Sequence, residues 1–344
     1  MRRLILTLLL AGCLAWPIAA AAQESADPMQ AAAAWLRAQQ QPDGGFSNGF
    51  VPESDPSTTA DAVLAIVAAG EDPLQWNAGG SDPLGFLRAA VASGSVEGPG
   101  AFAKLALAVV AAGDDPRSFG GTDLVAQILK GYSSDAGLFG GGPYDSALAI
   151  QALEAAGEPL PDGAIAGLLA TRLAEGAYSF NGDQTAGAGD SNTTAMAVMA
   201  LIAAGEDEEI APSLAYFRSV QNGDGGWTYQ KPSAFGEETD ANSTALVLQA
   251  LIAARENLAE WNDPTQTLLT LQVPSGAFIY NGATSSENLL ATVQAMPALG
   301  IPVPVEGGSA EGPWTTVGLA AAGVAIAAIL AYWALRKRRA GSGA

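Results

Sequence analysis

The feature that most constrains the fold of this 344-residue chain is a pattern repeated six times between residues 28 and 302. Each copy ends in a stretch rich in Ala, Leu, Val and Ile, and the stretch closes with Ala-Ala-Gly or a variant of it. The closing residues lie at intervals of 43, 44, 48, 50 and 45 residues, and they are Gly70, Gly113, Gly157, Gly205, Arg255 and Gly300. Such a period is typical of a repeat architecture in which one supersecondary unit recurs.

Each repeat is predicted to contain two helices. The closing stretches, such as residues 194–202, are apolar on nearly every side, as expected of a buried helix, and a following Gly suits a left-handed cap. A more amphipathic segment precedes each of them, for example residues 31–40 and 211–221. Stacked helix pairs form either an open solenoid or a ring, and six pairs favour closure. We therefore expect an all-α fold, an α6/α6 toroid with inner helices around a central axis.

A second motif marks the turns that follow the outer helices. Residues 40–46 have the sequence Gln-Gln-Pro-Asp-Gly-Gly-Phe, and residues 221–227 have Gln-Asn-Gly-Asp-Gly-Gly-Trp. Weaker copies lie at residues 135–139, 176–180 and 272–278. Asp-Gly-Gly favours a tight turn with positive φ. We expect the aromatic residue to anchor the turn against neighbouring helices and the Gln to cap an outer helix; the alternative is that the aromatic residues face a cavity.

A third motif stands at the start of three inner helices. It has the form Asp-x-(Ser/Asn)-(Thr/Ser)-Thr-Ala and begins at Asp55, Asp190 and Asp240. Asp, Asn, Ser and Thr are the preferred N-cap residues, so capping is the favoured role. Ligand contact in addition to capping is the alternative.

Taken together, the turn motif, the paired helices and the period resemble the terpenoid cyclase/protein prenyltransferase superfamily. These are the squalene-cyclase-like α/α toroids, which include prenyltransferase/squalene oxidase repeat proteins. The resemblance covers about residues 28–302 and implies a toroid with a central cavity open at one end. It does not define an activity, because the superfamily includes cyclases, zinc prenyltransferases, thioester domains and cobalamin carriers.

The residues that perform the superfamily's chemistry are largely replaced in this chain. The third motif is similar to the Asp-x-Asp-Asp-Thr-Ala box with which squalene-hopene-type cyclases protonate an alkene, but Ser, Thr or Asn replaces the central carboxylates in all three copies. Prenyltransferases hold zinc with Asp, Cys and His, whereas this chain has no His and only one Cys, Cys13. No metal site is therefore predicted, and no cofactor is assigned.

A binding toroid of the non-catalytic kind, akin to the cobalamin carriers, is the favoured function. Parallel inner helices bring their N-termini, with partial positive charge and free N–H groups, to one mouth. The ligand-binding candidates near that end are Tyr144, Tyr178, Phe180, Asn192, Trp227, Tyr229, Asn242, Phe278 and Tyr280. Their aromatic and polar groups suit a semi-polar or isoprenoid-like ligand, and the Pro-Tyr-Asp-Ser-Ala around Asp145 resembles helix starts of the cobalamin carriers.

Two other functions stay open. The chain is alternatively a divergent terpene cyclase-like or carbohydrate-active enzyme, with Asp145, Asp190 and Asp240 as weak catalytic candidates. A glycosidase needs two carboxylates that face the cavity, for which Asp61, Asp145 and Glu287 are candidates. The third possibility is a structural surface module whose cavity is filled by side chains.

Both ends of the chain predict where it is located. Arg2 and Arg3 precede an apolar run that ends in four alanines, which predicts a signal peptide over residues 1–22, cleaved after Ala22. The alternative is lipidation at Cys13, in Leu-Ala-Gly-Cys. Residues 315–335 are uncharged and long enough to span a bilayer core of about 30 Å. A basic tail, residues 336–344, follows and is expected to stay cytoplasmic, and residues 303–314 form an acidic tether.

Charge narrows the choice of partners. Residues 23–314 hold all 35 acidic residues but nine of the 15 basic ones, which gives this segment a net charge of −26. Nothing in it is suited to neutralise phosphates, so nucleic-acid binding is not expected. We expect a single-pass cell-membrane protein with an extracytoplasmic ectodomain, which contacts the membrane through its C-terminal helix and binds an unidentified small molecule or protein.

Overall fold

The structure is a computed structural model that describes residues 27–234 and 236–300. The predicted signal peptide (1–22), tether (303–314), transmembrane helix (315–335) and basic tail (336–344) lie outside the described residues. Within the described ranges, no helix is long and apolar enough to cross a membrane.

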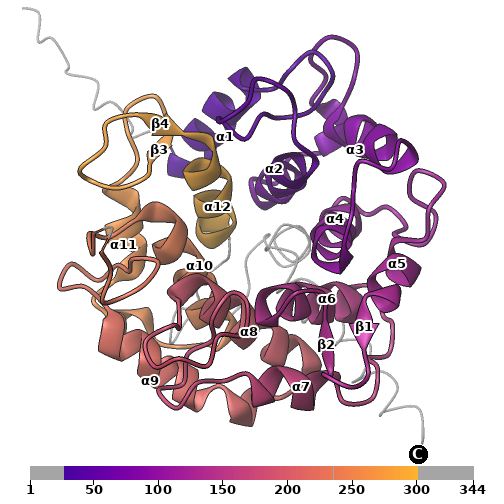
Figure 1. Cartoon of the computed structure of the whole chain (residues 1–344). Helices are drawn as coiled ribbons and strands as arrows, with labels where there is room; N and C mark the ends of the chain where they lie inside the picture. Colours follow the sequence, from indigo (N-terminus) through magenta and orange to yellow (C-terminus); the bar gives the residue numbers. More distant parts are fainter. Residues whose placement is uncertain (1–26, 235, 301–344) are drawn as a thin grey trace, which may run out of the picture.

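Twelve α-helices in the described part of the chain form two concentric rings, so the predicted all-α toroid is confirmed (Figure 1). The inner ring consists of α2 (Pro56–Ala68), α4 (Pro99–Ala111), α6 (Pro143–Ala155), α8 (Ser191–Ala204), α10 (Ala241–Ala253) and α12 (Leu289–Gly300). The outer ring consists of α1 (Pro28–Ala38), α3 (Pro83–Ala92), α5 (Leu124–Lys130), α7 (Ala164–Ala170), α9 (Ala211–Val220) and α11 (Pro264–Leu269).

The ring is closed by contacts between its first and last helices. Each inner helix packs against the next, and α12 returns to pack against α2. Each outer helix packs against the inner helix that precedes it in sequence, so α1 packs against α12. The two ends of the repeat array are thus held together by the same interface that joins neighbouring repeats.

Short elements complete the connections between helices. The strands β1 (Tyr132–Ser133) and β2 (Leu138–Phe139) pair antiparallel with Tyr132 opposite Phe139. The strands β3 (Phe278–Ile279) and β4 (Glu287–Asn288) pair antiparallel with Phe278 opposite Asn288. Three 3-10 helices follow inner helices, at Pro73–Gln75, Asp207–Glu209 and Leu258–Trp261.

The inner helices are buried on nearly every side because they lie between the two neighbouring inner helices and the outer ring. In α8, all residues except Asn192 and Ala204 are buried. The many alanines of the inner helices let the backbones of neighbouring inner helices approach closely. Five of the six inner helices are followed within two residues by a left-handed residue, as at Gly205 with φ 81°. Arg255 occupies the corresponding position in the fifth repeat and is also left-handed, with φ 58°. This conformation is less favourable for Arg than for Gly.

A hydroxyl near the start of the inner helices holds the aromatic residue of the turn motif. The backbone N–H of that aromatic residue donates to the Oγ of the Thr or Ser at distances of 2.9–3.0 Å. The pairs are Phe46 with Thr59, Phe139 with Ser146, Tyr178 with Thr194, Trp227 with Thr244 and Phe278 with Thr292. The second Thr of the helix-start motif is therefore explained by the fold alone.

The Gln of the turn motif joins neighbouring repeats, so the expectation that it caps an outer helix is corrected. Gln221 Nε2 donates to the carbonyl of Gly225 in its own turn and to that of Trp261 in the next repeat, at 2.9 and 2.7 Å. Gln272 Nε2 donates in the same way to Gly276 and to Pro28, at 2.9 and 2.8 Å, and so ties the last repeat to the first helix. One amide thus bonds two carbonyls, one in its own turn and one in the neighbouring repeat.

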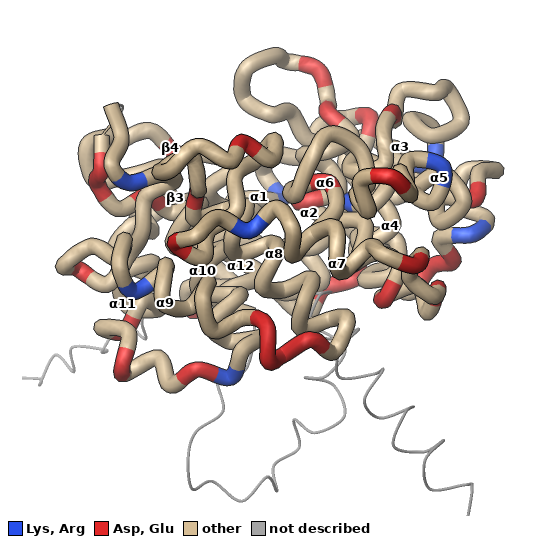
Figure 2. Tube along the Cα trace, turned by 60° about the horizontal axis from the view of Figure 1, so that its bottom comes forward, with Lys and Arg blue, Asp and Glu red and all other residues tan. Residues whose placement is uncertain are grey.

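Acidic residues outnumber basic ones along the described chain (Figure 2). Five arginines nevertheless pair with an acidic residue that follows an inner helix: Arg37 with Glu71, Arg88 with Asp114, Arg117 with Glu158, Arg172 with Glu209 and Arg218 with Glu256. Most of the few basic residues of the described chain thus link one repeat to the next.

Candidate functional site

The starts of α8, α10 and α12 meet at one end of the ring, which we call the mouth. The N–H of Ser191, at the start of α8, donates to the carbonyl of Tyr229 at 2.8 Å, and the N–H of Ala241, at the start of α10, donates to that of Tyr280 at 2.8 Å. Each helix start is therefore joined to the turn of the following repeat, and these turns form the rim.

A pocket of about 540 Å³ opens at the mouth, within the range of small-molecule sites. This mouth pocket is lined by Asn48, Gly49, Phe50, Asn192, Tyr229, Asp240, Asn242, Ser243, Tyr280, Glu287, Asn288, Leu289, Leu290 and Gln294. A second, more open depression of about 490 Å³ shares Tyr229 with it and includes Phe180 and Asp183.

Four of the predicted ligand-binding residues line the mouth pocket: Asn192, Tyr229, Asn242 and Tyr280. Tyr229 and Tyr280 are 41% and 39% exposed, which leaves ring surface for a ligand. Phe180 is exposed in the second depression, and Tyr144 packs against it with 5.1 Å between ring centroids. The structure therefore brings six of the nine candidates to the mouth region.

The other three candidates do not reach the mouth, and this corrects the expectation that they contact a ligand. Tyr178, Trp227 and Phe278 have no exposed surface. The Trp227 indole N–H donates to the carbonyl of Phe217 at 2.9 Å, and its ring lies 6.1 Å from that of Trp261. These residues anchor their turns, which was the favoured role of the turn aromatics.

Burial alternates within three aromatic pairs of the turns. In Tyr178/Phe180, Trp227/Tyr229 and Phe278/Tyr280, the first residue is buried and the second is exposed. The first is held down because its N–H is bonded to the helix hydroxyl, whereas the second lies where the chain turns toward the mouth. Residue type alone does not distinguish the two positions.

Sequence reasoning missed the loop that precedes α2. Phe50 is 91% exposed, the largest exposure among the large hydrophobic residues of the described chain, and it lines the mouth pocket with Asn48 and Gly49. Leu290 and Gln294 of α12 were also missed. No motif marks these positions; the only signal for Phe50 is an aromatic residue within a loop rich in Ser, Asn and Gly.

The three helix-start aspartates are N-caps, as predicted. Asp55 Oδ2 accepts from the N–H of Thr58 at 2.7 Å. Asp190 Oδ1 accepts from the N–H of Thr193, and Asp240 Oδ1 from that of Ser243, each at 2.7 Å. Burial raises the pKa of both Asp190 and Asp240 to about 6, against the opposing effect of the helix-start N–H groups.

Asp145 lies apart from the two other weak catalytic candidates. Its Oδ2 accepts from the N–H of Gly141 at 3.0 Å, and it is not among the residues that line the mouth pocket. Of the three, Asp240 alone lines this pocket. Across residues 27–234 and 236–300, no group of three or more Asp, Glu, Cys or His side chains lies close enough to hold a metal ion.

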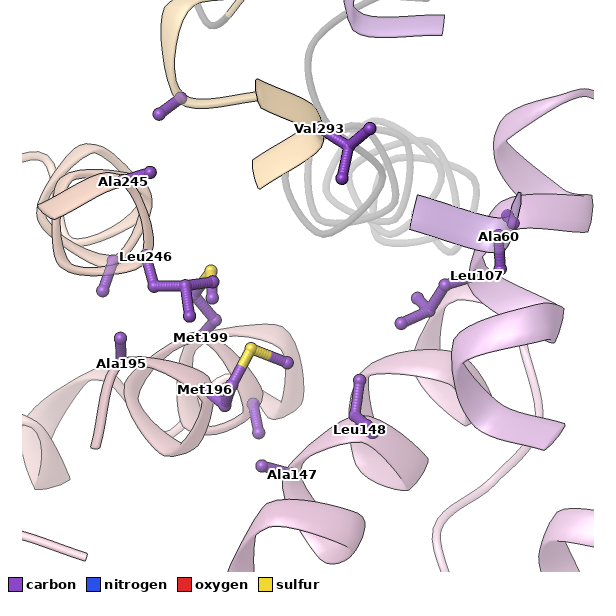
Figure 3. Packing of buried hydrophobic residues seen from close by; sticks show 14 of the residues in the cluster. Ala60, Leu107, Ala147, Leu148, Ala195, Met196, Met199, Ala245, Leu246 and Val293 are labelled. Atoms are coloured by element: carbon purple, nitrogen blue, oxygen red, sulfur yellow. The ribbon is translucent and has the colours of Figure 1, made fainter. Parts of the chain in front are cut away.

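Below the mouth, one position of each inner helix contributes to a layer around the axis. Each inner helix has a buried Ala or Val near its start, and the next residue belongs to this axial layer. The axial layer consists of Asp61, Lys104, Leu148, Met196, Leu246 and Gln294. Figure 3 shows Leu148, Met196 and Leu246 pointing into the space that the ring encloses. Asp61 and Lys104 are paired, with 3.0 Å between Nζ and Oδ2.

Comparison with known proteins identifies the fold class. No protein-family model and no curated protein matches the sequence. Among solved structures, a protein from Actinoplanes is similar with a TM-score of 0.58 and 15% identity, covering 79% of this chain and 97% of that chain. The Actinoplanes protein thus shares its fold with the described chain.

Two further structural relatives are enzymes. The type II terpene cyclase MstE from Scytonema aligns with a TM-score of 0.60 and 13% identity over 79% of this chain and 96% of its own. The unsaturated glucuronyl hydrolase from Bacillus sp. GL1 aligns with a TM-score of 0.56 and 13% identity, over 78% and 94%. The toroid fold expected from the superfamily resemblance is thus confirmed, and identities this low carry the fold alone.

Proposed function

We propose that this protein is a membrane-anchored, extracytoplasmic toroid that binds a small ligand in its mouth pocket without transforming it. The observation that carries the proposal is the pocket itself, in which the half-exposed rings of Tyr229 and Tyr280 lie beside the amides of Asn192 and Asn242. Aromatic surface with a few convergent polar groups is typical of small-molecule sites.

The direction of α12 supports a mouth pocket that faces away from the membrane. Leu290, near the start of α12, lines the mouth pocket, and the helix ends at Gly300. At about 1.5 Å per residue, that end lies about 15 Å further along the axis, on the face away from the mouth. An anchor that follows this end of the described chain is compatible with a mouth that is open to the surroundings.

The state of Asp240 supports a binding role over the cyclase mechanism. Its Oδ1 accepts from the N–H of Ser243 and its Oδ2 from the hydroxyl of Ser243, at 2.7 and 2.9 Å. Both oxygens are thus acceptors, whereas an acid that protonates an alkene must present its own proton to the substrate. No second carboxylate stands at the neighbouring positions of the motif to hold such a proton.

Native mass spectrometry of the full-length chain, purified from its own membrane fraction, tests the proposal. We expect a co-purifying molecule of fixed mass that is lost in the Tyr229→Ala/Tyr280→Ala double variant. Tyr132→Phe is the control, because this hydroxyl donates to the carbonyl of Asp162 and lines neither depression. A chain that carries no such molecule, or that turns over squalene or a prenyl diphosphate, would contradict the proposal.

A second candidate function, an enzyme, is favoured by one observation. Asp240 lines the pocket, and burial raises its pKa to about 6, close to the range where a carboxyl group exchanges protons at neutral pH. Asp240→Asn distinguishes the two functions, since Asn is an equally good N-cap but cannot exchange a proton. Loss of a measured turnover with unchanged thermal stability would favour the enzyme.

A further inference from the structure

Three buried oxygen atoms at the start of α8 have no hydrogen-bond partner: Asp190 Oδ2, Asn192 Oδ1 and Thr193 Oγ1. Asp190 and Thr193 are 1% and 0% exposed. The hydroxyls of Thr193 and Tyr229 lie close enough to lower the pKa of Asp190, yet neither completes a hydrogen bond to its Oδ2. Since buried polar groups in folded proteins are nearly always bonded, three such atoms at one helix start require an explanation.

In the two other helices that carry the motif, the Asp carboxylate is bonded to the hydroxyl three residues further on. The hydroxyl of Thr58 donates to Asp55 Oδ2 at 2.7 Å, and that of Ser243 donates to Asp240 Oδ2 at 2.9 Å. The amide of Asn242, which corresponds to Asn192, donates to Gln294 Oε1 at 2.8 Å. The unbonded state is therefore specific to α8 and does not come from the motif.

The start of α8 borders the mouth pocket, although Asp190 itself lines neither depression and its Oδ2 is covered. Asn192 lines the pocket. Tyr229, whose hydroxyl lowers the pKa of Asp190, lines both the pocket and the second depression. A carboxylate oxygen and an amide oxygen accept hydrogen bonds and donate none. A ligand that completes this helix start must therefore bring donors.

Charge at the mouth favours a positively charged donor. The residues that line the two depressions include Asp183, Asp240 and Glu287 but no Lys or Arg. Six inner-helix N-termini supply together about +3 elementary charges as partial charges. Full carboxylates near these starts outweigh them: Asp55, Asp145, Asp190, Asp240 and Glu287. The half-exposed rings of Tyr229 and Tyr280 add faces that attract cations.

We propose that the mouth pocket takes an organic cation with N–H donors, a primary or secondary ammonium, seated against Asp190 and Asn192 at the start of α8. Rotation of the Asn192 side chain, which lines the pocket, uncovers Asn192 Oδ1 and Asp190 Oδ2, to which the ammonium then donates, and the ring of Tyr229 flanks it. A divalent metal ion is disfavoured, because it requires about six or more oxygen ligands, several of them carboxylates. This inference rests on the proposed function and names the class of ligand.

Three probes of one shape test the inference: phenethylamine, phenethyl alcohol and 3-phenylpropionate, which are cationic, neutral and anionic at neutral pH. Each is titrated calorimetrically into the full-length chain in detergent, with empty micelles as the blank. We expect the amine to bind at least about tenfold more tightly than the alcohol, a difference that shrinks with added salt, and the anion not to bind.

Two variants assign the preference to α8. Asp190→Asn keeps an N-cap acceptor and removes the charge, so it should abolish the advantage of the amine over the alcohol. Asn192→Leu leaves the cap intact and should weaken amine binding. Asp123→Asn is the matched control, since Asp123 caps the outer helix α5 through the N–H of Ala126 and lines neither depression.

Equal binding of amine and alcohol, or an amine preference that survives both α8 variants, would overturn the inference. So would the absence of amine binding up to about 10 mM. None of these results removes the ligand pocket itself, which is judged by the molecule that co-purifies with the chain. The ligand class and the binding function therefore fail separately.

Discussion

Asp61 of α2 and Lys104 of α4 form an ion pair inside the ring, with 3.0 Å between Lys104 Nζ and Asp61 Oδ2. Their side chains are only 13% and 16% exposed. Three of the other four positions of the axial layer hold Leu148, Met196 and Leu246. Burial opposes the charge of Lys104, but the Asp61 carboxylate more than offsets this and raises the Lys104 pKa above its ordinary value. Burial in turn raises the pKa of Asp61, against the lowering effect of Lys104, so each group of the pair depends on the other for its charge in largely apolar surroundings.

Breaking this pair should destabilise the toroid more than removing it. Lys104→Met leaves the Asp61 carboxylate buried without a partner, and we expect a loss of about 3 kcal/mol in the free energy of unfolding. The double variant Asp61→Leu/Lys104→Met removes both charges and should recover most of that loss. Urea unfolding of the single and double variants measures both values. Equal losses in the two variants would show that the pair does not act as a unit.

The pH dependence of stability should carry the signature of Asp190 and Asp240. Burial raises the pKa of each to about 6 from 3.8, so between these values the folded chain holds protons that the unfolded chain has released. Stability from these groups is therefore present below about pH 4 and falls as pH rises to 6, by up to about 2–3 kcal/mol each.

Because other carboxylates contribute to the pH profile, the informative quantity is the difference between wild type and Asp190→Asn. This variant should flatten the decline between pH 4 and 6 and leave the profile above pH 7 parallel to the wild type. A wild-type profile unchanged by the substitution would contradict the raised pKa of Asp190. Asp123→Asn, at an outer helix, serves as the control.

Arg255 offers a stabilising substitution. Its φ of 58° is left-handed, where an L-residue other than Gly pays roughly 1 kcal/mol, and the preceding repeat has Gly205 at the corresponding position with φ 81°. Arg255→Gly should therefore raise the free energy of unfolding by about 0.5–1 kcal/mol. Gly205→Ala is the matched inverse: no atom lies within 4 Å of the added Cβ, so its loss reports the backbone conformation alone.

Ring closure should depend on Gly276, in the turn that holds α1. A Cβ added at Gly276 would lie 2.1 Å from the carbonyl oxygen of Ala31, and its φ is 95°. We expect Gly276→Ala to destabilise the toroid by at least about 3 kcal/mol, because a clash with backbone adds to a disfavoured conformation. Gly282→Ala, which meets nothing within 4 Å, should stay close to wild type in thermal melting.

Phe50 should separate binding from stability. It is 91% exposed and lines the mouth pocket, so Phe50→Ser removes apolar surface from the site without removing it from the core. We expect a change of no more than about 0.5 kcal/mol in unfolding and a clear loss of the co-purifying ligand. Unchanged ligand retention would exclude this loop from the site.

Several features of the fold follow from local sequence. The period, the alanine-rich inner helices and the helix-start aspartates specify their own structure, because an N-cap such as Asp240 bonds an N–H only three residues away. Closure of the ring follows from the same repetition: the last repeat offers α1 the surface that every other repeat offers its neighbour. The twelve helices and their pairing were accordingly predictable from the residues.

The site was decided by tertiary structure. Trp227 and Tyr229 lie two residues apart in one turn, yet the first is buried against Trp261 and the second lines the pocket. The difference comes from distant partners: the hydroxyl of Thr244 holds the N–H of Trp227, and the N–H of Ser191 in the previous repeat holds the carbonyl of Tyr229. Likewise, the helix starts of α8 and α10 share one motif, yet Asp190 Oδ2 is unbonded whereas Asp240 Oδ2 accepts from Ser243. Local sequence therefore determined the repeats, whereas contacts between repeats determined which side chains a ligand can reach.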